Sequence, residues 1–163
     1  MRNRAFLVVV AVLGLLPLGL AGWGELQLRR GQHVLIPVVP VDPHDLFRGE
    51  YVALSYGISS LPASESVEPG DTVYVSLDGP ASTWSDHWAM RHHPARGRFI
   101  RGTVEYGGQL EQRARIRYGI ETFYVEEGKA IDYERAIRSR NLYADVSIAG
   151  DGKARLARLV VKP

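Results

Sequence analysis

The alternation of apolar and charged residues over positions 110–120 constrains the fold of this chain more than any other feature. One face of this segment carries Leu110, Gln112, Ala114, Ile116, Tyr118 and Ile120. The opposite face carries Glu111, Arg113, Arg115 and Arg117. A period of two is typical of a half-buried β-strand. Gly107-Gly108 lies just before it and suits a tight turn, so we expect residues 98–106 and 109–118 to form a β-hairpin.

The arginine face of this hairpin has two interpretations. Arg113, Arg115 and Arg117 are suited to contact anionic lipid headgroups or a phosphate ligand. The alternative is a solvated strand face whose arginines form ion pairs with cross-strand acids such as Glu105. We prefer the second interpretation, because mixed charges on an exposed strand face are common.

The rest of the chain after residue 32 reads as further short strands separated by turns. We expect strands at residues 33–39, 50–58, 72–77, 142–148 and 153–161, and a loop at 59–70. One helix is expected at residues 129–140, with Ile131 and Ile137 on its apolar stripe and Asn141 as its C-terminal stop. The pattern predicts a mainly β, single antiparallel domain with one or two short helices.

A hydrophobic segment precedes this domain. Residues 5–23 contain no charged side chain, and at about 1.5 Å per residue they span roughly 28 Å, close to the thickness of a bilayer core. Arg2 and Arg4 precede the segment, so the positive-inside rule places the N-terminus in the cytoplasm and the domain outside. We expect one transmembrane helix in the inner membrane. A cleaved signal peptide, with Gly19 and Ala21 near the cleavage site, is the alternative.

Composition excludes several classes of function. Arg2 and Arg4 account for the formal net charge of +2, because the other basic residues balance the 18 acidic ones. Nucleic acid is therefore not an expected partner. The chain has no cysteine, which excludes disulfides and thiolate chemistry. The five histidines fit neither helical nor strand spacing for metal ligands, and we predict no metal site and no cofactor.

A complete helix-capping pattern lies at residues 39–56. Asp42 is suited to cap a helical turn, Pro43 to its first position, Asp45 to the reciprocal capping bond and Gly49 to its end. Asp42, Asp45, Arg48 and Glu50 together could instead perform acid–base chemistry or bind a cation. We prefer the structural interpretation, since the capping pattern accounts for each residue.

Two motifs resemble one family. Residues 49–56, GEYVALSY, resemble the pattern GDYXXLXY, after which a family of membrane-anchored bacterial proteins is named. A second block resembles the family's downstream signature and comprises residues 118–121, 123–125 and 127–128. Glu50 stands where the family name has Asp, and Glu126 where Pro is expected. The resemblance implies an anchored extracytoplasmic domain associated with a polytopic membrane protein, and it implies no established activity.

The motif residues suggest one rival site. Tyr51 and Tyr56 are five residues apart and would face opposite sides of a regular strand, so at least one is expected in the core with a hydroxyl partner. Gly119 suggests a bulge that re-aims Glu121. If Glu121 approaches Glu50 and Tyr51, the three form a candidate site; the alternative is a carboxylate paired with Arg48 or Arg101.

No nucleophile motif is visible, and we predict no catalytic residue. The candidate binding and motif residues are Asp42, Arg48, Glu50, Tyr51, Tyr56, Gly119 and Glu121. We divide the chain into an anchor or signal peptide at 1–24, a juxtamembrane stalk at 25–32 and a β domain at 33–163. The predicted function is an envelope accessory protein acting with a polytopic membrane partner. The alternative is a small hydrolase or ligand-binding module using Glu50, Tyr51 and Glu121.

Overall fold

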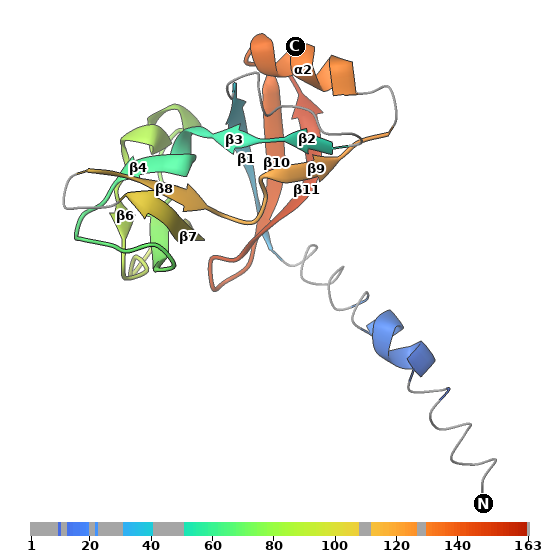
Figure 1. Ribbon diagram of the computed structural model, residues 1–163, viewed down its shortest axis with the longest axis horizontal. Coiled ribbons are helices and arrows are strands. Elements are labelled where there is room, and N and C mark those ends of the chain that lie inside the picture. Colours follow the sequence, from blue (N-terminus) through green and yellow to red (C-terminus); the bar gives the residue numbers. More distant parts are fainter. Residues whose placement is uncertain are drawn as a thin grey trace, which may run out of the picture.

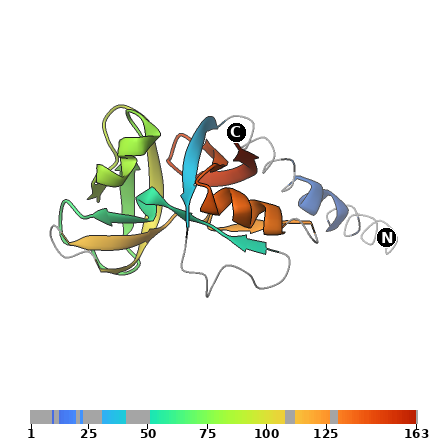
Figure 2. The ribbon, with the colours of Figure 1, turned by 90° about the horizontal axis from the view of Figure 1, so that it is seen from above.

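The fold is mainly β and is built from antiparallel sheets (Figure 1). The computed structural model describes residues 10, 13–19, 22, 31–40, 51–107, 112–126 and 130–162. A four-stranded and a five-stranded sheet lie side by side, and the chain that contains β2, β3 and β4 runs between them (Figure 2). The prediction of a mainly β fold with antiparallel sheets is confirmed.

The first sheet has the strand order β11-β10-β1-β3. It comprises β1 (Gln32–Val39), β3 (Ser55–Tyr56), β10 (Leu142–Ile148) and β11 (Ala154–Val161). β1 alternates in burial, with Val34, Ile36 and Val38 turned into the core. Val34 and Ile36 lie opposite Val146 and Ala144 of β10, and Val38 lies opposite Tyr56 of β3. β10 is buried over most of its length and lies between β1 and β11.

The second sheet has the order β4-β8-β7-β5-β6. It comprises β4 (Ser60–Pro62), β5 (Thr72–Ser76), β6 (Ala89–Met90), β7 (Phe99–Gly107) and β8 (Arg113–Arg117). β7 and β8 pair antiparallel, which confirms the predicted hairpin. Ala114, Ile116 and Tyr118 are buried as expected. β4 was wrongly predicted as part of a loop, because its partner β8 lies some fifty residues away in sequence and gives no local signal.

The prediction of one continuous strand at residues 50–58 is wrong. β2 (Tyr51–Ala53) pairs with β9 (Thr122–Tyr124), and the chain then turns at Leu54 so that β3 pairs with β1. The Leu54 amide donates to the Glu121 carbonyl oxygen at 2.7 Å. A 3-10 turn, η1 (Gly57–Ser59), follows and leads into β4. The motif thus supplies strands to two different sheets.

Helix α2 (Ala130–Arg138) confirms the predicted helix and the buried position of Ile137, but not the inward position of Ile131 or the stop residue. Ala136 and Ile137 are buried, whereas Ile131 is 63% exposed. The amides of Arg140 and Asn141 donate to the carbonyls of Ile137 and Ala136, which is the Schellman pattern. Arg140, with φ of 57°, therefore occupies the left-handed position that ends the helix.

The N-terminal segment is described in part, and residues 13–19 are helical. Within the described residues, no helix combines the length and the apolar character that crossing a membrane requires.

One buried cluster extends through both sheets and holds them together. Ile36 and Val146 come from the first sheet, and Val73 and Ile100 from the second. Leu54 and Tyr56, on the segment that crosses between the sheets, belong to the same cluster. The motif at residues 49–56 therefore contributes residues to the junction of the two sheets.

Candidate functional site

The seven candidate residues separate into three groups. Asp42, Arg48 and Glu50 lie outside the described residues, as does the whole predicted capping turn. Tyr56, Gly119 and Glu121 meet at the junction of the two sheets. Tyr51 lies apart from them, at the first position of β2.

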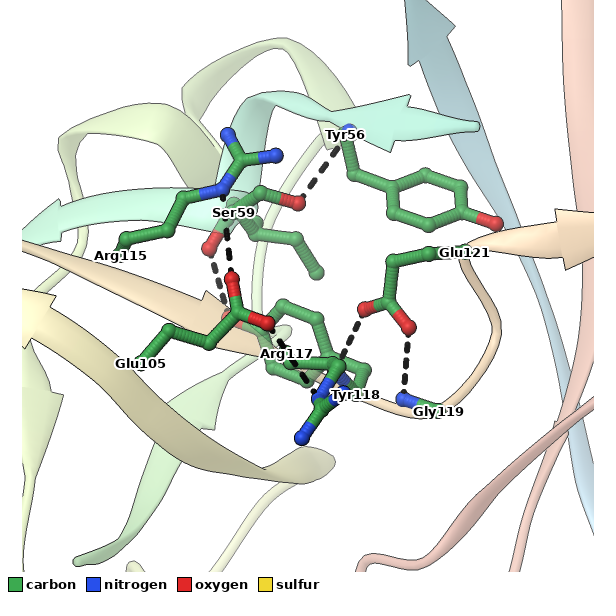
Figure 3. A network of polar contacts seen from close by, with 9 residues as sticks. Tyr56, Ser59, Glu105, Arg115, Arg117, Tyr118, Gly119 and Glu121 are labelled. Atoms are coloured by element: carbon green, nitrogen blue, oxygen red, sulfur yellow. Dashed lines mark hydrogen bonds and ion pairs between the residues drawn. The ribbon is translucent and has the colours of Figure 1, made fainter. Parts of the chain in front are cut away.

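The junction is closed by Tyr56 and Tyr118, both labelled in Figure 3, and each hydroxyl bonds to the opposite chain segment. The Tyr56 hydroxyl donates to the Ile120 carbonyl oxygen at 2.6 Å, and the Tyr118 hydroxyl donates to the Ile58 carbonyl oxygen at 2.6 Å. Both side chains are buried, so each hydroxyl satisfies a carbonyl that is removed from water. We call Tyr56, Ile58, Tyr118, Ile120 and Glu121 the tyrosine clasp. The expectation that at least one motif tyrosine is a core residue with a hydroxyl partner is confirmed.

Glu121 stabilises the turn that carries Tyr118. One carboxylate oxygen, Oε1, accepts the Tyr118 amide at 2.6 Å, and the other, Oε2, accepts the Gly119 amide at 2.9 Å (Figure 3). Gly119 has φ of +79°, a left-handed conformation that favours glycine. The Gly119 signal therefore marks a sharp turn between β8 and β9, and the turn re-aims Glu121 back onto its own backbone.

The clasp has a consistent electrostatic signature. Burial raises the pKa of both tyrosine hydroxyls well above the ordinary value, and the negative charge of Glu121 raises each further. Both tyrosines therefore stay protonated and remain hydrogen-bond donors over the whole physiological range. A protonated, buried phenol that donates to a main-chain carbonyl is a structural group, because its proton is not available for exchange with a substrate.

Tyr51 is part of a different surface. It lies opposite Tyr124 in the β2–β9 ladder, and the two rings pack edge to face with centroids 6.2 Å apart. Tyr124 is 77% exposed, and Tyr51 is half-buried. α2 contacts β2, and its Tyr133 packs edge to face on Phe123. Because side chains alternate along a strand, Phe123 lies on the opposite face of the ladder from Tyr51 and Tyr124. We call Tyr51 and Tyr124 the ribbon surface.

The rival site of Glu50, Tyr51 and Glu121 gains no contact from the described residues. Both oxygens of Glu121 are engaged by backbone amides, and Tyr51 packs on Tyr124. Arg101, one of the partners considered for Glu121, pairs with Asp151 at 3.3 Å. The bidentate capping role of Glu121 was not anticipated, and its signal in the sequence is the short spacing from Gly119.

The arginine face of β8 forms ion pairs with a cross-strand acid, as the interpretation that we preferred predicts. Glu105 lies at a register shift in β7 and contacts Arg117 at 3.4 Å and Arg115 at 4.0 Å (Figure 3). Arg113 donates to the carbonyl oxygen of Ser60 on β4. These contacts lie at the surface and orient the three arginines more than they stabilise the fold.

No group of three or more histidine or acidic side chains in the described part of the chain is arranged to hold a metal ion. His33 instead contacts Asp145, with Nδ1 2.8 Å from Oδ1, and Arg158 donates from Nε to the other oxygen at 3.0 Å. Burial raises the pKa of Asp145, but the hydrogen bonds from His33 and Arg158 outweigh it and leave that pKa below its ordinary value. This cluster links β1, β10 and β11, and sequence reasoning did not find it because it depends on strand order.

Comparison with known proteins identifies one family. Residues 13–159 match the family described as GDYXXLXY protein, which covers most of the chain. No curated protein and no solved structure matches the chain.

Proposed function

Because the chain belongs to the GDYXXLXY family, we propose that it is an envelope accessory protein whose β domain docks on a polytopic membrane protein. Residues 5–23 anchor it in the inner membrane with the N-terminus inside, and the domain lies outside the cytoplasm. The ribbon surface supplies the docking contact.

The different environments of the two motif tyrosines carry this proposal. Tyr56 has a structural role, because its ring is in the core and its hydroxyl bonds to the carbonyl oxygen of Ile120. Tyr51 is half-buried and packs edge to face on Tyr124, whose side chain is 77% exposed. Tyrosine is enriched in interfaces because it buries a large ring at low entropic cost and keeps a polar group. A motif tyrosine left at the surface is therefore suited to a partner.

The hydrophobic segment supports the location. Among the described residues of its helical part, Leu13, Leu15, Leu16 and Leu18 are each more than 60% exposed. Such side chains are stabilised when an apolar environment removes them from water, and lipid is such an environment. The absence of charge over residues 5–23 and the two preceding arginines agree with an inserted anchor.

The ligand-binding alternative requires Glu121 to act on a bound molecule. Its two oxygens already accept two backbone amides, so using it for chemistry would break the turn that holds Tyr118. We therefore place the function at the ribbon surface and not at the clasp.

The decisive experiment is purification of the full-length protein from mild detergent, with quantification of a co-purifying integral membrane protein. We expect Tyr124→Ala and Tyr51→Ala to reduce that partner at least ten-fold while the protein stays folded. Tyr106→Ala is the matched control, because Tyr106 is 65% exposed but lies on β7. Retention of the partner by both ribbon variants, or equal loss in the control, would contradict the proposal.

Location is tested separately. A periplasm-active reporter fused after Pro163 is expected to be functional, and the protein is expected to resist carbonate extraction with its own N-terminus intact. A reporter active only in the cytoplasm would overturn the orientation. A mature protein that begins near Gly22 would show a cleaved signal peptide.

A further inference from the structure

A second surface lies where the two sheets meet on the side of β7. β8 separates from β7 after Arg117, because the chain turns at Gly119. The turn of the β10–β11 hairpin lies against the edge of β7 from which β8 has separated. Its Gly152 carbonyl oxygen accepts a hydrogen bond from the Arg101 amide at 2.8 Å. A Cβ on Gly152 would lie 2.7 Å from the Phe99 ring, so glycine is needed for this close approach.

Two adjoining hollows flank this contact, and Arg101 lines both. The first, of about 390 Å³, is lined by Tyr74, His93, Arg96, Phe99, Arg101 and Asp151, among others. The second, of about 230 Å³, includes Thr72, Arg101, Thr103, Arg117 and Lys153 in its lining. We call the two together the Arg101 cleft. It is aromatic at one end and basic at the other.

The aromatic end presents ring faces for stacking. Tyr74 and Phe99 are half-buried neighbours on β5 and β7, with centroids 5.8 Å apart in an edge-to-face arrangement. His93 stacks on Phe99 at 5.6 Å and 17°. Two stacked rings lie about 3.5 Å apart. A nucleobase held between two of these rings would therefore need a separation of about 7 Å between them. The rings therefore suit a ligand that stacks on one face, as a pyranose does.

The basic end is suited to an anion. Arg101, Arg117 and Lys153 line the second hollow, where Arg117 also contacts Glu105 at 3.4 Å, and Arg96 adds a charge at the first. Among the described residues that line the cleft, Asp151 is the acidic one, and it contacts Arg101 at 3.3 Å. That pair is exposed on both sides, with 35% and 56% of the side-chain surfaces open, so Arg101 can exchange Asp151 for a ligand carboxylate at low cost. Thr72 and Thr103 offer hydroxyls between them.

From these observations we infer that the Arg101 cleft binds an acidic saccharide. A sugar ring packs against one of the aromatic rings that line the first hollow, and the carboxylate of the same or the next ring pairs with Arg101 and Lys153. This activity goes beyond docking to a membrane partner and uses none of the residues of the ribbon surface. The two proposals therefore succeed or fail independently.

The test is a calorimetric titration of the full-length protein in detergent micelles. The probe is a tetramer of β-1,4-linked glucuronic acid, and cellotetraose is its neutral counterpart. We expect the acidic tetramer to bind at least ten-fold more tightly than cellotetraose, and its binding to weaken as salt is added.

Two substitutions are expected to act in opposite directions. Arg101→Gln should weaken binding of the acidic tetramer about ten-fold, the scale of a lost charge-assisted contact. Asp151→Asn should strengthen it about two- to three-fold, since it frees Arg101 from its competitor. Asn keeps the side-chain oxygen that accepts the Lys153 amide at 3.0 Å, so the turn is preserved.

Arg113→Gln is the matched control, because it removes an arginine from the same sheet at a position outside the cleft. It should leave binding unchanged, as should Tyr124→Ala. Equal affinity for the acidic and neutral tetramers, or no binding of either, would overturn the inference. Preferential binding of uridine monophosphate or inorganic phosphate would overturn the saccharide assignment and identify a phosphate site.

Discussion

The tyrosine clasp and the ribbon surface are built from the same motif, and the comparison between them explains most of what the motif does. Tyr56 and Tyr118 donate to carbonyls on the opposite segment and are buried. Tyr51 and Tyr124 contact each other across a two-stranded ladder, and Tyr124 remains largely in water. One pair of tyrosines joins the two large sheets, and the other pair lies at the surface of the separate β2–β9 ladder.

This difference shows that residue type alone does not assign a role. A buried phenol must satisfy its hydroxyl, so it fixes the position of the segment whose carbonyl it bonds. An exposed phenol has water as its partner and constrains little, which leaves its ring free for another surface. Five positions separate Tyr51 from Tyr56, and the chain turn at Leu54 sends them into these different environments.

The comparison is tested most strongly by truncating one tyrosine of each pair. Tyr56→Ala should lower the free energy of unfolding by about 3–5 kcal/mol, because it leaves a cavity in the core and an unpaired carbonyl. Tyr51→Ala should change it by about 1 kcal/mol or less. Urea denaturation of both variants measures the difference. Similar losses in the two would show that the ribbon surface is also part of the fold.

Alkaline pH should weaken the clasp specifically. The pKa values of Tyr56 and Tyr118 are raised above the ordinary value of 10.0 by burial and by the charge of Glu121. The unfolded chain therefore loses these protons first, so stability is fully present below about pH 10 and falls as the pH rises above it.

Unfolding midpoints between pH 9 and pH 11.5 measure this fall. Tyr56→Phe should lose about 1–3 kcal/mol at pH 8, where its carbonyl partner is left unpaired, and should show a shallower fall above pH 10. A slope identical to that of the unmodified protein would show that Tyr56 does not contribute to the titration.

Glu121→Gln tests the anionic part of the clasp. The amide side chain offers one acceptor oxygen in place of two, so one of the Tyr118 and Gly119 amides loses its partner. We expect a loss of about 1–2 kcal/mol in thermal or chemical denaturation. Glu105→Gln is the control, since its ion pairs with Arg115 and Arg117 lie at the surface and should cost about 0.5 kcal/mol or less. An equal effect of the two substitutions would refute the capping role.

Gly119→Ala tests the turn that Glu121 caps, and its expected effect is smaller than that of Tyr56→Ala or Glu121→Gln. No atom lies within 4 Å of the position that a Cβ would occupy, so the cost is confined to the left-handed backbone at φ of +79°. We expect a loss of about 1 kcal/mol in the melting transition, with the ribbon surface unaffected. A neutral or stabilising result would mean that the turn relaxes to another conformation.

Local patterns predicted the elements whose signal lies within one short segment. The β7–β8 hairpin follows from alternation and a Gly-Gly turn, and α2 follows from an apolar spacing of which Ile137 is buried. β4 was missed, because a strand of three residues is defined by its partner and not by its own pattern. The division of the motif into β2 and β3 was missed for the same reason.

Within the candidate site, the sequence indicated that Gly119 re-aims Glu121 and that a motif tyrosine is buried. It could not indicate where the carboxylate points, since the turn returns Glu121 to the amides of Tyr118 and Gly119. It also offered Arg101 as a partner for Glu121, whereas the β10–β11 turn brings Asp151 to Arg101. Partners of charged residues are decided by strand order, which spans distances that local patterns do not encode.

The sequence by itself determined the β class, the hairpin, the helix and the family motifs, because backbone propensity, side-chain alternation and turn residues act over a few positions. The tertiary structure alone decided that Tyr56 is buried and hydrogen-bonded while Tyr51 is half-buried against the exposed Tyr124, that Glu121 caps a turn, and that Arg101 lines an open cleft. Those outcomes depend on which segments meet across the junction of the two sheets, and burial and hydrogen-bond satisfaction are settled only when they meet.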